Sequence, residues 1–559
     1  MLVITHYLAS FSPGFKIGFY HVTCQFPRLL KREENKLYAK KILTVVFADG
    51  ERRSQAVNIP LRSFSKEKMS LLYLKYAESK LPVVFHGFLC ILAYLFWASL
   101  AALMLPMLLI YKLFKLLEKG VITYQKLGTE LATFDLVLLH ESDGNPNYIS
   151  ALMMIKGKAD IAKLRSLVET KIIIGQLEKT YTRMKQRVTK CYNTYLWRDE
   201  ENFNINDHIV AYGNDNVSSK DELEKIFTEL SSVPIPDNIS PWLFTIINLA
   251  GKEEMYCIHF QLHHCIGDGF AMVGLLGQLV DSKLKLIEPK KNHGVMAYPI
   301  RRIIQGIVTG PLVLLVLLLS RYVGNPFKTE TPPSRKKVSW TNSIELDTVK
   351  AIKNTTDSTV NDVITSCIAG AIRKYLQSKG NQEPEDMPIT MTYNSRSVSI
   401  KTLDCIPLGN HSGATFLKLP VSVADPEKRL KLTKARIDAM KKSSDPHLFS
   451  FIYSFVLGHL PESLSRLSLS FLNRHCSLVY SNVPGPLEPI HVTGQEIKSI
   501  MVTPPLAFDL GISIAVLTYA GNLRLTVLSD ERVLEDPSKL TQIFEEEIYD
   551  LAHRASKKD

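Results

Sequence analysis

The chain has 559 residues, of which 46% are hydrophobic and 22% are charged, and its formal net charge is +12. Such a length exceeds one simple domain, so we expect two lobes with attached segments. No lysine- or arginine-rich helix with interleaved aromatic side chains occurs, which argues against a nucleic-acid partner. An anionic membrane surface or the phosphates of a coenzyme suit the charge better. The eight cysteines form no Cys-x-x-Cys pair, as is typical of reduced cysteines in a cytosol-facing protein.

The chain begins with a basic segment, residues 1–82, whose first residues lack the features of a secretory signal. Residues 83–111 contain no Asp, Glu, Lys or Arg. As a helix they would reach about 44 Å, whereas a bilayer core measures about 30 Å. We therefore predict a membrane segment at 83–117, either a spanning helix or a hairpin bent near Pro106. A buried core helix is the weaker alternative, because helices of soluble proteins rarely stay uncharged for so long.

Residues 125–290 are predicted to form a first globular lobe. Strand-like runs such as YISALMMIKG alternate there with helical runs such as ADIAKLRSLVETKI, which indicates a mixed sheet with packed helices. Residues 255–263 alternate with the period of a strand, and a Gly-Lys-Glu-Glu turn joins them to residues 242–249. The two segments are therefore expected to pair as a hairpin.

The predicted strand 255–263 ends in the pattern His-His-x-x-x-Asp-Gly, made by His263, His264, Asp268 and Gly269. A tight turn and an apolar helix from Phe270 follow it. A base at the end of a strand is held rigidly, and glycines leave room for an approaching group. A neutral imidazole with a pKa of about 6.5 can take the proton of an alcohol as that alcohol attacks a thioester. We predict that His264 is the general base of an acyltransferase and that His263 is its structural neighbour.

Asp268 has three candidate roles: it could orient the imidazole, cap the following helix, or bind a cation across the interface between lobes. The motif leaves Arg396 as the candidate cation, which a carboxylate could hold in a bidentate pair. We favour a structural role for Asp268. Histidine pairs also bind metals, but no third His, Cys or Glu stands at a recognisable spacing, so no metal site is predicted. A serine nucleophile is disfavoured because no Gly-x-Ser-x-Gly occurs.

A crossover, residues 291–340, is predicted between the lobes, and it contains a second apolar run at 303–320. If this run and a helix at 83–111 both spanned the bilayer, the two lobes would face opposite compartments and could not share one active site. We therefore expect a re-entrant or interfacial segment, interrupted at Gly310-Pro311, with flanking arginines at the lipid headgroups.

Residues 341–559 are predicted to form the second lobe. Its expected elements, in chain order, are a helix at 359–376, a strand at 388–397, a basic helix at 427–442, a rigid turn at 481–486, a hairpin at 512–529 and a helix at 537–553.

Seven segments occur in the order typical of one family: WRDEENFNINDHI (197–209), ISPW (239–242), HHCIGDG (263–269), TVNDVITSCIAGAIRKYL (359–376), GNHSGATFLKLP (409–420), SNVPGP (481–486) and PPLAFDLGISIAVLTYAGNLRLTVLSD (504–530). In these segments the chain resembles the wax ester synthase/diacylglycerol acyltransferase family of the coenzyme A-dependent acyltransferases. The resemblance covers residues 130–555. It implies a mixed α/β fold with two chloramphenicol acetyltransferase-like lobes and a tunnel between them. Acyl-coenzyme A would enter from one side and the acceptor from the other.

The same resemblance assigns site residues. His264 takes the place of the family's base, and Asp268 and Gly269 complete its motif. Asn361 and Asp362 match an Asn-Asp pair of the second lobe that supports the site. Arg396 stands where the family has a Pro-Val-Ser-x-Arg segment, of which only the arginine is kept here. From the residues alone, Asn361 is equally a helix N-terminal residue that offers a cap.

The sequence thus predicts a membrane-bound enzyme that transfers a long acyl group from coenzyme A to a long-chain alcohol, giving wax ester, or to diacylglycerol, giving triacylglycerol. It would need no cofactor, since acyl-coenzyme A is a substrate. The expected location is the endoplasmic reticulum with the lobes facing the cytosol, with the plasma membrane and lipid droplets as alternatives. The rival interpretation is a non-catalytic lipid-binding or membrane-interaction protein built on an acyltransferase shell.

Overall fold

The computed structural model describes residues 42–47, 55–60 and 83–557, apart from 142–144, 214–216, 252, 287–299, 321–324, 330, 332, 334, 397–405 and 508. The chain divides into two units, Met1–Ser79 with Val316–Gly324, and Lys80–Leu315 with Asn325–Asp559. In the first unit, β1 (Ile42–Phe47) and β2 (Gln55–Pro60) pair antiparallel. The rest of the basic segment 1–82 lies outside the described residues. The site belongs to the second unit.

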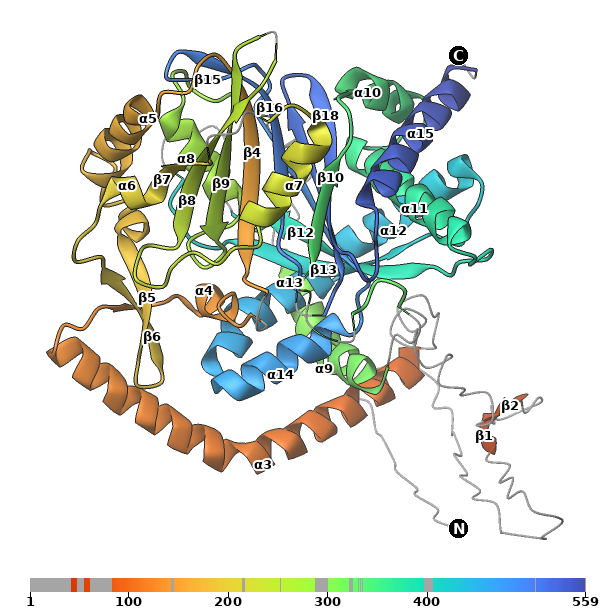
Figure 1. Ribbon diagram of the computed structural model, residues 1–559. Coiled ribbons are helices and arrows are strands. Elements are labelled where there is room, and N and C mark those ends of the chain that lie inside the picture. The colour runs from red at the N-terminus through yellow and green to blue at the C-terminus, as the bar shows by residue number, and fades with distance from the viewer. Residues whose placement is uncertain are drawn as a thin grey trace, which may run out of the picture. The chain divides into compact units, whose positions relative to one another are not determined.

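The first lobe is built on a six-stranded sheet in the second unit (Figure 1). Its order is β15 (His491–Val492), β16 (Gln495–Thr503), β4 (Tyr148–Lys156), β9 (Met255–His263), β8 (Trp242–Leu249) and β7 (Ile209–Ala211). The predicted hairpin is confirmed, because β8 and β9 pair antiparallel with Trp242 opposite Leu262. A three-stranded sheet lies beside it, in the order β3 (Thr129–Glu130), β6 (Thr194–Asp199), β5 (Gln186–Cys191).

Short helices complete this lobe: α4 (Thr133–Val137), α5 (Ile161–Val168), η2 (Glu169–Ile173), η3 (Thr182–Lys185), α6 (Ile205–His208), α7 (Lys220–Leu230) and α8 (Gly269–Leu279). Three predicted elements of this lobe are confirmed. Strand β4 is the strand at the start of the lobe, α5 is the helix that follows it, and α8 is the apolar helix after the histidines.

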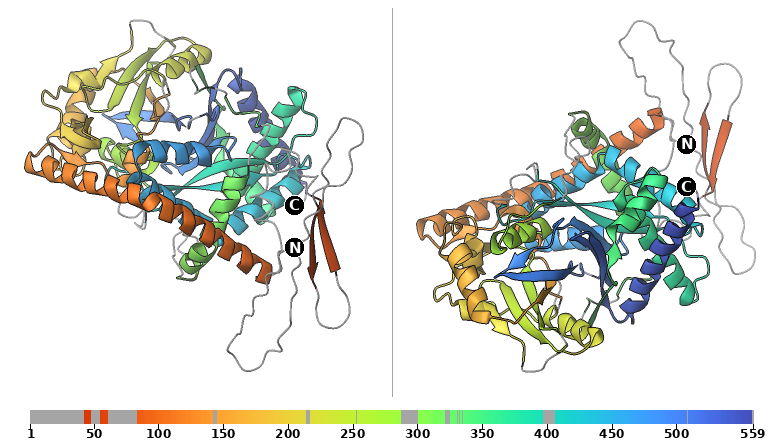
Figure 2. Two further views of the ribbon diagram at one scale, coloured as in Figure 1. Left: turned by 90° about the horizontal axis from the view of Figure 1, so that it is seen from below. Right: turned by 90° about the horizontal axis from the view of Figure 1, so that it is seen from above.

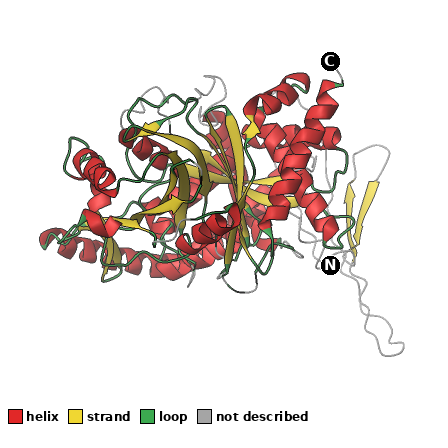
Figure 3. Ribbon diagram, turned by 45° about the horizontal axis from the view of Figure 1, so that its top comes forward, coloured by secondary structure: helices red, strands yellow, loops and turns green. Residues whose placement is uncertain are grey.

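The second lobe is built on a seven-stranded sheet. Its order is β10 (Lys336–Trp340), β18 (Asn522–Asp530), β17 (Ile512–Tyr519), β14 (Val479–Pro484), β12 (Met387–Asn394) and β13 (Ser412–Leu419), with β11 (Ile344–Glu345) also paired to β18. Its helices are α10 (Leu346–Thr355), α11 (Val360–Ser378), α12 (Pro426–Lys442), α13 (Asp445–Phe451), η5 (Ile452–Val456), η6 (Leu457–His459), α14 (Glu462–Asn473) and α15 (Pro537–Ser556). Figure 3 shows the strands gathered in the centre of this unit with helices outside them.

Most predicted elements of the second lobe are confirmed: α11, β12, α12, the β17–β18 hairpin and α15. The hairpin turn has two residues in the left-handed region, Ala520 with φ 47° and Gly521 with φ 78°, as a tight two-residue turn requires. The predicted turn at 481–486 is wrong, because most of it belongs to strand β14, which pairs in parallel with β17. Pro484 is the last residue of that strand, where a missing N–H group costs no ladder hydrogen bond.

The sheets of the two lobes do not follow the predicted boundaries, because a strand of the predicted second lobe joins the sheet of the first. Strand β16 lies in the predicted second lobe, 341–559, yet it pairs antiparallel with β4 in the sheet of the first lobe. Strand β10 begins inside the predicted crossover, 291–340, and pairs with β18 in the second lobe. Sequence periodicity indicates a strand but not the sheet edge on which it pairs, so this exchange could not be read from the pattern.

The two apolar runs form two helices, α3 (Val83–Tyr124) and α9 (Ile300–Leu319). Helix α3 continues through Pro106, so the predicted hairpin bent at that residue is wrong. Helix α9 likewise continues through Pro311, so the expected interruption at Gly310-Pro311 is absent from it. An internal proline removes one hydrogen bond and can bend a helix without ending it. By length and composition alone, both helices are long and apolar enough to cross a membrane.

Candidate active site

The histidine pair lies at the end of β9, between two neighbouring strands that fix its backbone. The His263 N–H group donates to the carbonyl of Pro241, and the His264 N–H group donates to the carbonyl of Asn147. The next turn leads directly into α8, whose N-cap is Asp268. The predicted capping role of Asp268 is confirmed, because its Oδ1 accepts from the Ala271 N–H group at 3.0 Å.

The imidazole of His264 is oriented by Asn410, a residue of the second lobe. Nδ1 of His264 lies 2.9 Å from Oδ1 of Asn410. The amide nitrogen of Asn410 donates to the His264 carbonyl at 2.7 Å and to Oδ1 of Asp135 at 2.8 Å. Because that nitrogen is committed to two acceptors, Oδ1 of Asn410 must accept, and Nδ1 of His264 must carry the hydrogen. Nε2 of His264 is then unprotonated and available as a base.

Behind Asn410 stands an ion pair between Asp135 on α4 and Arg183 on η3, with 2.7 Å between Nη2 and Oδ2. Arg183 also donates to the carbonyls of Cys265 and Ile266, which belong to the turn after the histidines. Burial raises the pKa of Asp135, while the Arg183 guanidinium acts in the opposite direction. The pair therefore anchors Asn410 and the turn after the histidines at the same point.

Burial also governs His264 itself. It lowers the pKa of the imidazole below its ordinary value, and the Asp268 carboxylate opposes this shift. A base with a lowered pKa stays neutral at cytosolic pH, so its lone pair is not lost to a proton from solvent.

His263 points to different partners. Its Nδ1 accepts from the Cys265 N–H group at 3.1 Å, so its Nε2 carries the hydrogen and faces Oε2 of Glu141 at 3.2 Å. The edge of Tyr148 packs against the ring, with 5.4 Å between centroids. His263 does not line the cavity described below. Its contacts suit the predicted role of structural neighbour.

Asp268 and Arg396 form the predicted pair across the lobes. Nη1 of Arg396 lies 2.8 Å from each carboxylate oxygen, and both side chains are buried. Nη2 of Arg396 donates to the Gly409 carbonyl, and Oδ2 of Asp268 accepts from the His411 N–H group at 2.8 Å. The two charged groups thus hold the residues on either side of Asn410. Asp268 acts on His264 through this segment.

Gly409 belongs to the same clamp. Its N–H group donates to the Ile266 carbonyl at 2.7 Å, and its φ is 113°, a left-handed value that favours glycine. A Cβ atom there would lie 3.4 Å from the Arg183 guanidinium. The backbone approach of the two lobes therefore depends on this glycine.

The second-lobe pair Asn361 and Asp362 lies at the start of α11 and does not line the cavity. Thr359 is the N-cap, and it forms a capping box with Asp362. Asn361 is therefore not the cap, which leaves the other interpretation: its Oδ1 accepts from Asn482 at 2.9 Å. Asn482 does line the cavity, so Asn361 supports the wall of the site while Asp362 supports the helix.

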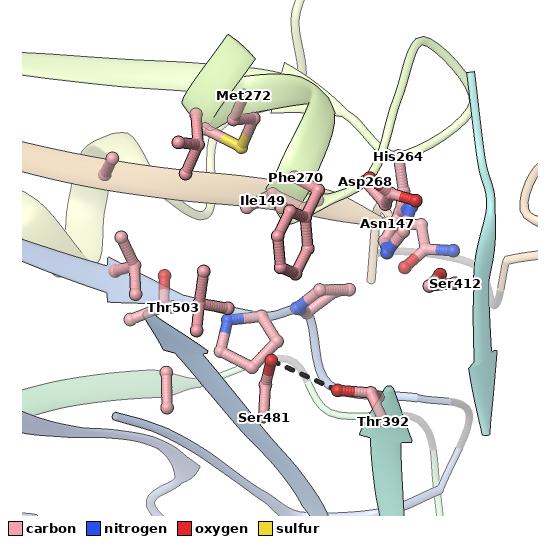
Figure 4. A pocket seen from close by; sticks show the side chains of 18 of the residues that line it. Asn147, Ile149, His264, Asp268, Phe270, Met272, Thr392, Ser412, Ser481 and Thr503 are labelled. Atoms are coloured by element: carbon pink, nitrogen blue, oxygen red, sulfur yellow. Dashed lines mark hydrogen bonds between the residues drawn. The ribbon is translucent and has the colours of Figure 1, made fainter. Parts of the chain in front are cut away.

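A cavity lined by residues of both lobes runs between them; the space it encloses, with the open solvent at its mouth, is about 2290 Å³. His264, Asp268 and Gly269 line it from the first lobe, and apolar side chains dominate the rest of its wall. Phe270 and Met272 of α8 point into it, while Thr392 and Ser481 of the second lobe form a hydrogen bond of 3.2 Å on the opposite side (Figure 4). His264 thus stands at a polar place in a cavity whose wall is mostly apolar.

Among the described residues, no group of three or more His, Cys, Asp or Glu side chains is arranged to hold a metal ion.

Three residues of the site were not predicted: Asn410, Asp135 and Arg183. Asn410 lies in the GNHSGATFLKLP segment, which carried the resemblance without suggesting a role for its asparagine. Asp135 and Arg183 belong to no motif. Asp135 lies 275 positions before its partner Asn410 in the sequence, so no local pattern connects the two residues.

Two family models match this chain. The model described as wax ester synthase/diacylglycerol acyltransferase catalytic domain matches residues 131–299, and the model of the WS/DGAT C-terminal domain matches residues 408–552. The chain belongs to the wax ester synthase/diacylglycerol acyltransferase family. It is accordingly an acyltransferase, and the predicted family membership is confirmed.

Members of this family from bacteria and plants resemble the chain at low identity. A putative diacylglycerol O-acyltransferase of Mycobacterium tuberculosis is 23% identical over 388 residues, which cover 64% of this chain and 76% of that protein. Wax ester synthase/diacylglycerol acyltransferase 7 of Arabidopsis thaliana is 22% identical over 410 residues, which cover 64% of this chain and 85% of that protein.

Solved structures of acyltransferases share the fold. A wax ester synthase/diacylglycerol acyltransferase of Marinobacter aquaeolei matches with a TM-score of 0.56 and 16% identity, covering 77% of this chain and all of that one. A trichothecene 15-O-acetyltransferase of Fusarium sporotrichioides matches with a TM-score of 0.52 and 11% identity, covering 76% of this chain and 94% of that one. The predicted mixed α/β fold with two chloramphenicol acetyltransferase-like lobes is confirmed.

Proposed function

We propose that this protein transfers a long-chain acyl group from acyl-coenzyme A to a long-chain alcohol or to diacylglycerol, with His264 as general base. The observation that carries the proposal is the unprotonated Nε2 of His264, held by Asn410, at the wall of an apolar cavity between the lobes. No other described histidine that lines this cavity has the same setting, since His140 is bonded to Ser465.

In the proposed reaction, Nε2 of His264 takes the proton of the acceptor hydroxyl while the oxygen attacks the thioester carbonyl. A new carbon–oxygen bond forms, and the carbonyl electrons move onto its oxygen. When they return, the carbon–sulfur bond breaks and the coenzyme A thiolate leaves. The proton on His264 then passes to that thiolate. Ester and free coenzyme A are released, and the base is regenerated without a cofactor.

The length and apolar lining of the cavity support a lipid acceptor. A long-chain alcohol is our first choice and diacylglycerol the second; the plant relative is named for both activities and the mycobacterial relative for diacylglycerol alone. The apolar helices α3 and α9 support attachment to a membrane, where both acceptors and both products partition. We place the lobes on the cytosolic side, where acyl-coenzyme A is found, with the endoplasmic reticulum as the first location to examine.

The test is esterification by the full-length protein in membranes, with labelled palmitoyl-coenzyme A and either hexadecanol or dioleoylglycerol. We expect His264→Ala to lower ester formation by about 10² to 10⁴-fold, the usual contribution of a general base. His491→Ala, which removes an exposed histidine of β15, is the matched control and should keep full activity. Full activity of His264→Ala would refute the mechanism. Binding of acyl-coenzyme A by the wild type without any ester would support the rival, a non-catalytic lipid-binding protein.

A further inference from the structure

Helix α3 has one narrow stripe that faces the protein along almost its whole length. Its partly or fully buried side chains are spaced three, four or seven residues apart, which places them on one face of the helix. They are Ala93, Trp97, Met104, Leu108, Tyr111 and Lys115. Helix α3 therefore packs lengthwise on the folded lobes of its own unit (Figure 2). A helix that left the lobes to cross a bilayer would be covered only near one end.

Polar contacts fix this arrangement at both ends of the stripe. The Trp97 indole donates to the Pro311 carbonyl of α9 at 2.8 Å. The Lys115 ammonium donates to the hydroxyl of Thr194, on β6, at 2.7 Å. Between Trp97 and Lys115 the helix advances about 27 Å, close to the thickness of a bilayer core of about 30 Å. From Tyr111 to Lys119, α3 lies against polar parts of the lobes that hydrocarbon would not accommodate.

One such part is the ion pair between Lys190 of β5 and Glu462 of α14, with 2.9 Å between the atoms. It lies near Tyr111 of α3, whose hydroxyl donates to the carbonyl of Leu460 at 3.5 Å, two residues before Glu462. Charged side chains are strongly disfavoured in the bilayer centre. The middle of α3 therefore cannot occupy the core of a bilayer while it keeps its contacts with the lobes.

The opposite side of α3 is apolar and exposed. Its large side chains include Leu103, which is 76% exposed, and Leu109, Phe114 and Leu116, each at least 60% exposed. Exposed apolar side chains occur also on α9, α13, η5 and α14, among them Ile307, Phe451, Phe455 and Leu467. Helix α3 contacts α9 through Trp97, and it contacts Leu460, just before α14, through Tyr111. We call these exposed side chains and those of α3 the apolar face. Soluble monomers rarely expose so many large apolar side chains to water on neighbouring helices.

Basic residues accompany the apolar face. Helix α3 carries Lys112 and Lys119 among its exposed positions, and the first turn of α9 carries Arg301 and Arg302. Apolar side chains with flanking cations are typical of helices that lie in the interface of an anionic membrane.

We propose that the apolar face docks on a lipid bilayer with α3 lying in the membrane plane, so that the whole protein stays on one side. The occupant is a membrane surface that contains anionic lipid. Burying the outward side chains of α3 in one leaflet removes them from water and leaves every contact with the lobes intact.

This orientation also gives the lipid acceptor a direct route to His264, a step that rests on the proposed function. Helix α14 and η5 each have one side in the cavity, at Leu469 and Tyr453, and the other on the apolar face, at Leu467 and Phe455. They form a wall one helix thick between membrane and cavity. Segment η5 is a π-helix, a form that recurs at functional sites. The acceptor would pass this wall without crossing water.

The first test is topology. Full-length protein carrying an epitope tag before Met1 and a second tag after Asp559 is treated with protease in sealed microsomes. With α3 in the membrane plane, both tags are digested at the same protease concentration, with and without detergent. If α3 spans the bilayer, one tag is protected until detergent is added, and that result would overturn the proposal.

The second test is binding to vesicles of phosphatidylcholine with about 30% phosphatidylserine, whose negative charge attracts the basic residues beside the apolar face. We expect Leu109→Glu with Leu116→Glu to lower vesicle partitioning at least about tenfold, because two charges would enter the apolar interface. Ile174→Glu is the matched control, since Ile174 is 65% exposed but belongs to another part of the surface. Partitioning of the double variant equal to that of the control would refute the docking face.

The two proposals can fail separately. The double variant should keep wild-type turnover with a short, water-soluble alcohol, while it loses vesicle binding and long-chain esterification. His264→Ala should bind vesicles like the wild type and form ester about 10² to 10⁴-fold more slowly with either alcohol. Loss of activity toward the short alcohol in the double variant would show that the apolar face supports the fold and not docking.

Discussion

Substitution of Asn410 by alanine is the sharpest perturbation of the site, because it removes the orienting group of His264 without touching the base. The side chain of Asn410 makes three hydrogen bonds, two with His264 and one with Asp135. When His264 takes the alcohol proton it becomes an imidazolium, and the bond from its Nδ1–H to Oδ1 becomes charge-assisted. Such bonds contribute about 1.5–3 kcal/mol, against about 0.5–1.5 kcal/mol for neutral ones.

The difference, about 1–1.5 kcal/mol, is lost specifically in the transition state and corresponds to about a tenfold lower kcat. The freed imidazole can also rotate or change tautomer, which adds to the loss. We therefore expect Asn410→Ala to lower kcat about 10- to 100-fold with a smaller change in KM. The assay is steady-state esterification of hexadecanol in membranes. Asn410→Asp supplies a further reading: a carboxylate facing Nδ1 stabilises the imidazolium, so the acid limb of the pH profile should move to higher pH.

A purely structural role for Asn410 would give another pattern. Asn325→Ala is the matched control, because the Asn325 side chain likewise both donates and accepts, in two hydrogen bonds with Cys476 and Phe327, away from His264. Both alanine variants should lose about 1–3 kcal/mol of unfolding free energy, the usual cost of unpaired buried groups. Only Asn410→Ala should lower kcat. A kcat within threefold of wild type, together with an unmoved pH profile for Asn410→Asp, would refute the assignment.

Three further predictions concern the charges and caps around the site. Asp268→Asn leaves the buried Arg396 guanidinium without its carboxylate and should lower the free energy of unfolding in denaturant by about 3–5 kcal/mol. Adding Arg396→Met should recover most of this loss, and additive losses from the two substitutions would contradict the pairing. Asp362→Ala should lower the free energy of unfolding by about 1 kcal/mol through loss of the capping box and leave kcat unchanged. Asn361→Ala should instead change KM or kcat several-fold, because it removes the partner of Asn482. A kinetic effect of Asp362→Ala without one of Asn361→Ala would be evidence against both roles. Because burial lowers the pKa of His264 below its ordinary 6.5, the neutral base persists into more acid solution, and kcat/KM should fall only below pH 6.5; an acid limb at or above that pH would contradict it.

The sequence predicted those helices and hairpins whose residues form a regular apolar pattern over a short stretch of chain. The hairpin β8–β9 follows from alternation on each side of a polar turn, and α11 follows from an apolar stripe behind a Thr-Val-Asn-Asp start. Strand β14 was missed because proline and glycine favour a turn. Pro484 can end this strand because it pairs with β17 on one side only, while β12 pairs with β14 at Val479 and Tyr480. The exchange of β16 into the first lobe depends on which sheet edge is free, a property of the assembled lobes and not of residues 495–503.

The site divides in the same way. His264 and Asp268 could be predicted because one strand, one turn and one helix carry them within a few residues. The pair Asp268–Arg396 could be considered only because a buried carboxylate in the motif requires a cationic partner, and Arg396 was the candidate. Asn410 and Asp135 come from distant segments, and an asparagine that accepts and donates at once leaves no charge or periodicity in the sequence. Such residues become visible only when the hydrogen bonds are traced outward from the base.

The orientation of His264 depends on both lobes, and this restricts how substrates can reach it. The base comes from the first lobe and its orienting amide from the second. Separating the lobes would break the buried pair Asp268–Arg396, the backbone bond from Gly409 to Ile266 and the ladder between β16 and β4. Loss of the buried ion pair alone would cost about 3–5 kcal/mol. Acyl-coenzyme A and the acceptor are therefore expected to enter the cavity while the lobes stay closed, the acceptor by way of the wall formed by α14 and η5. A closed site keeps the orientation of His264 through each turnover and limits the access of water to the thioester.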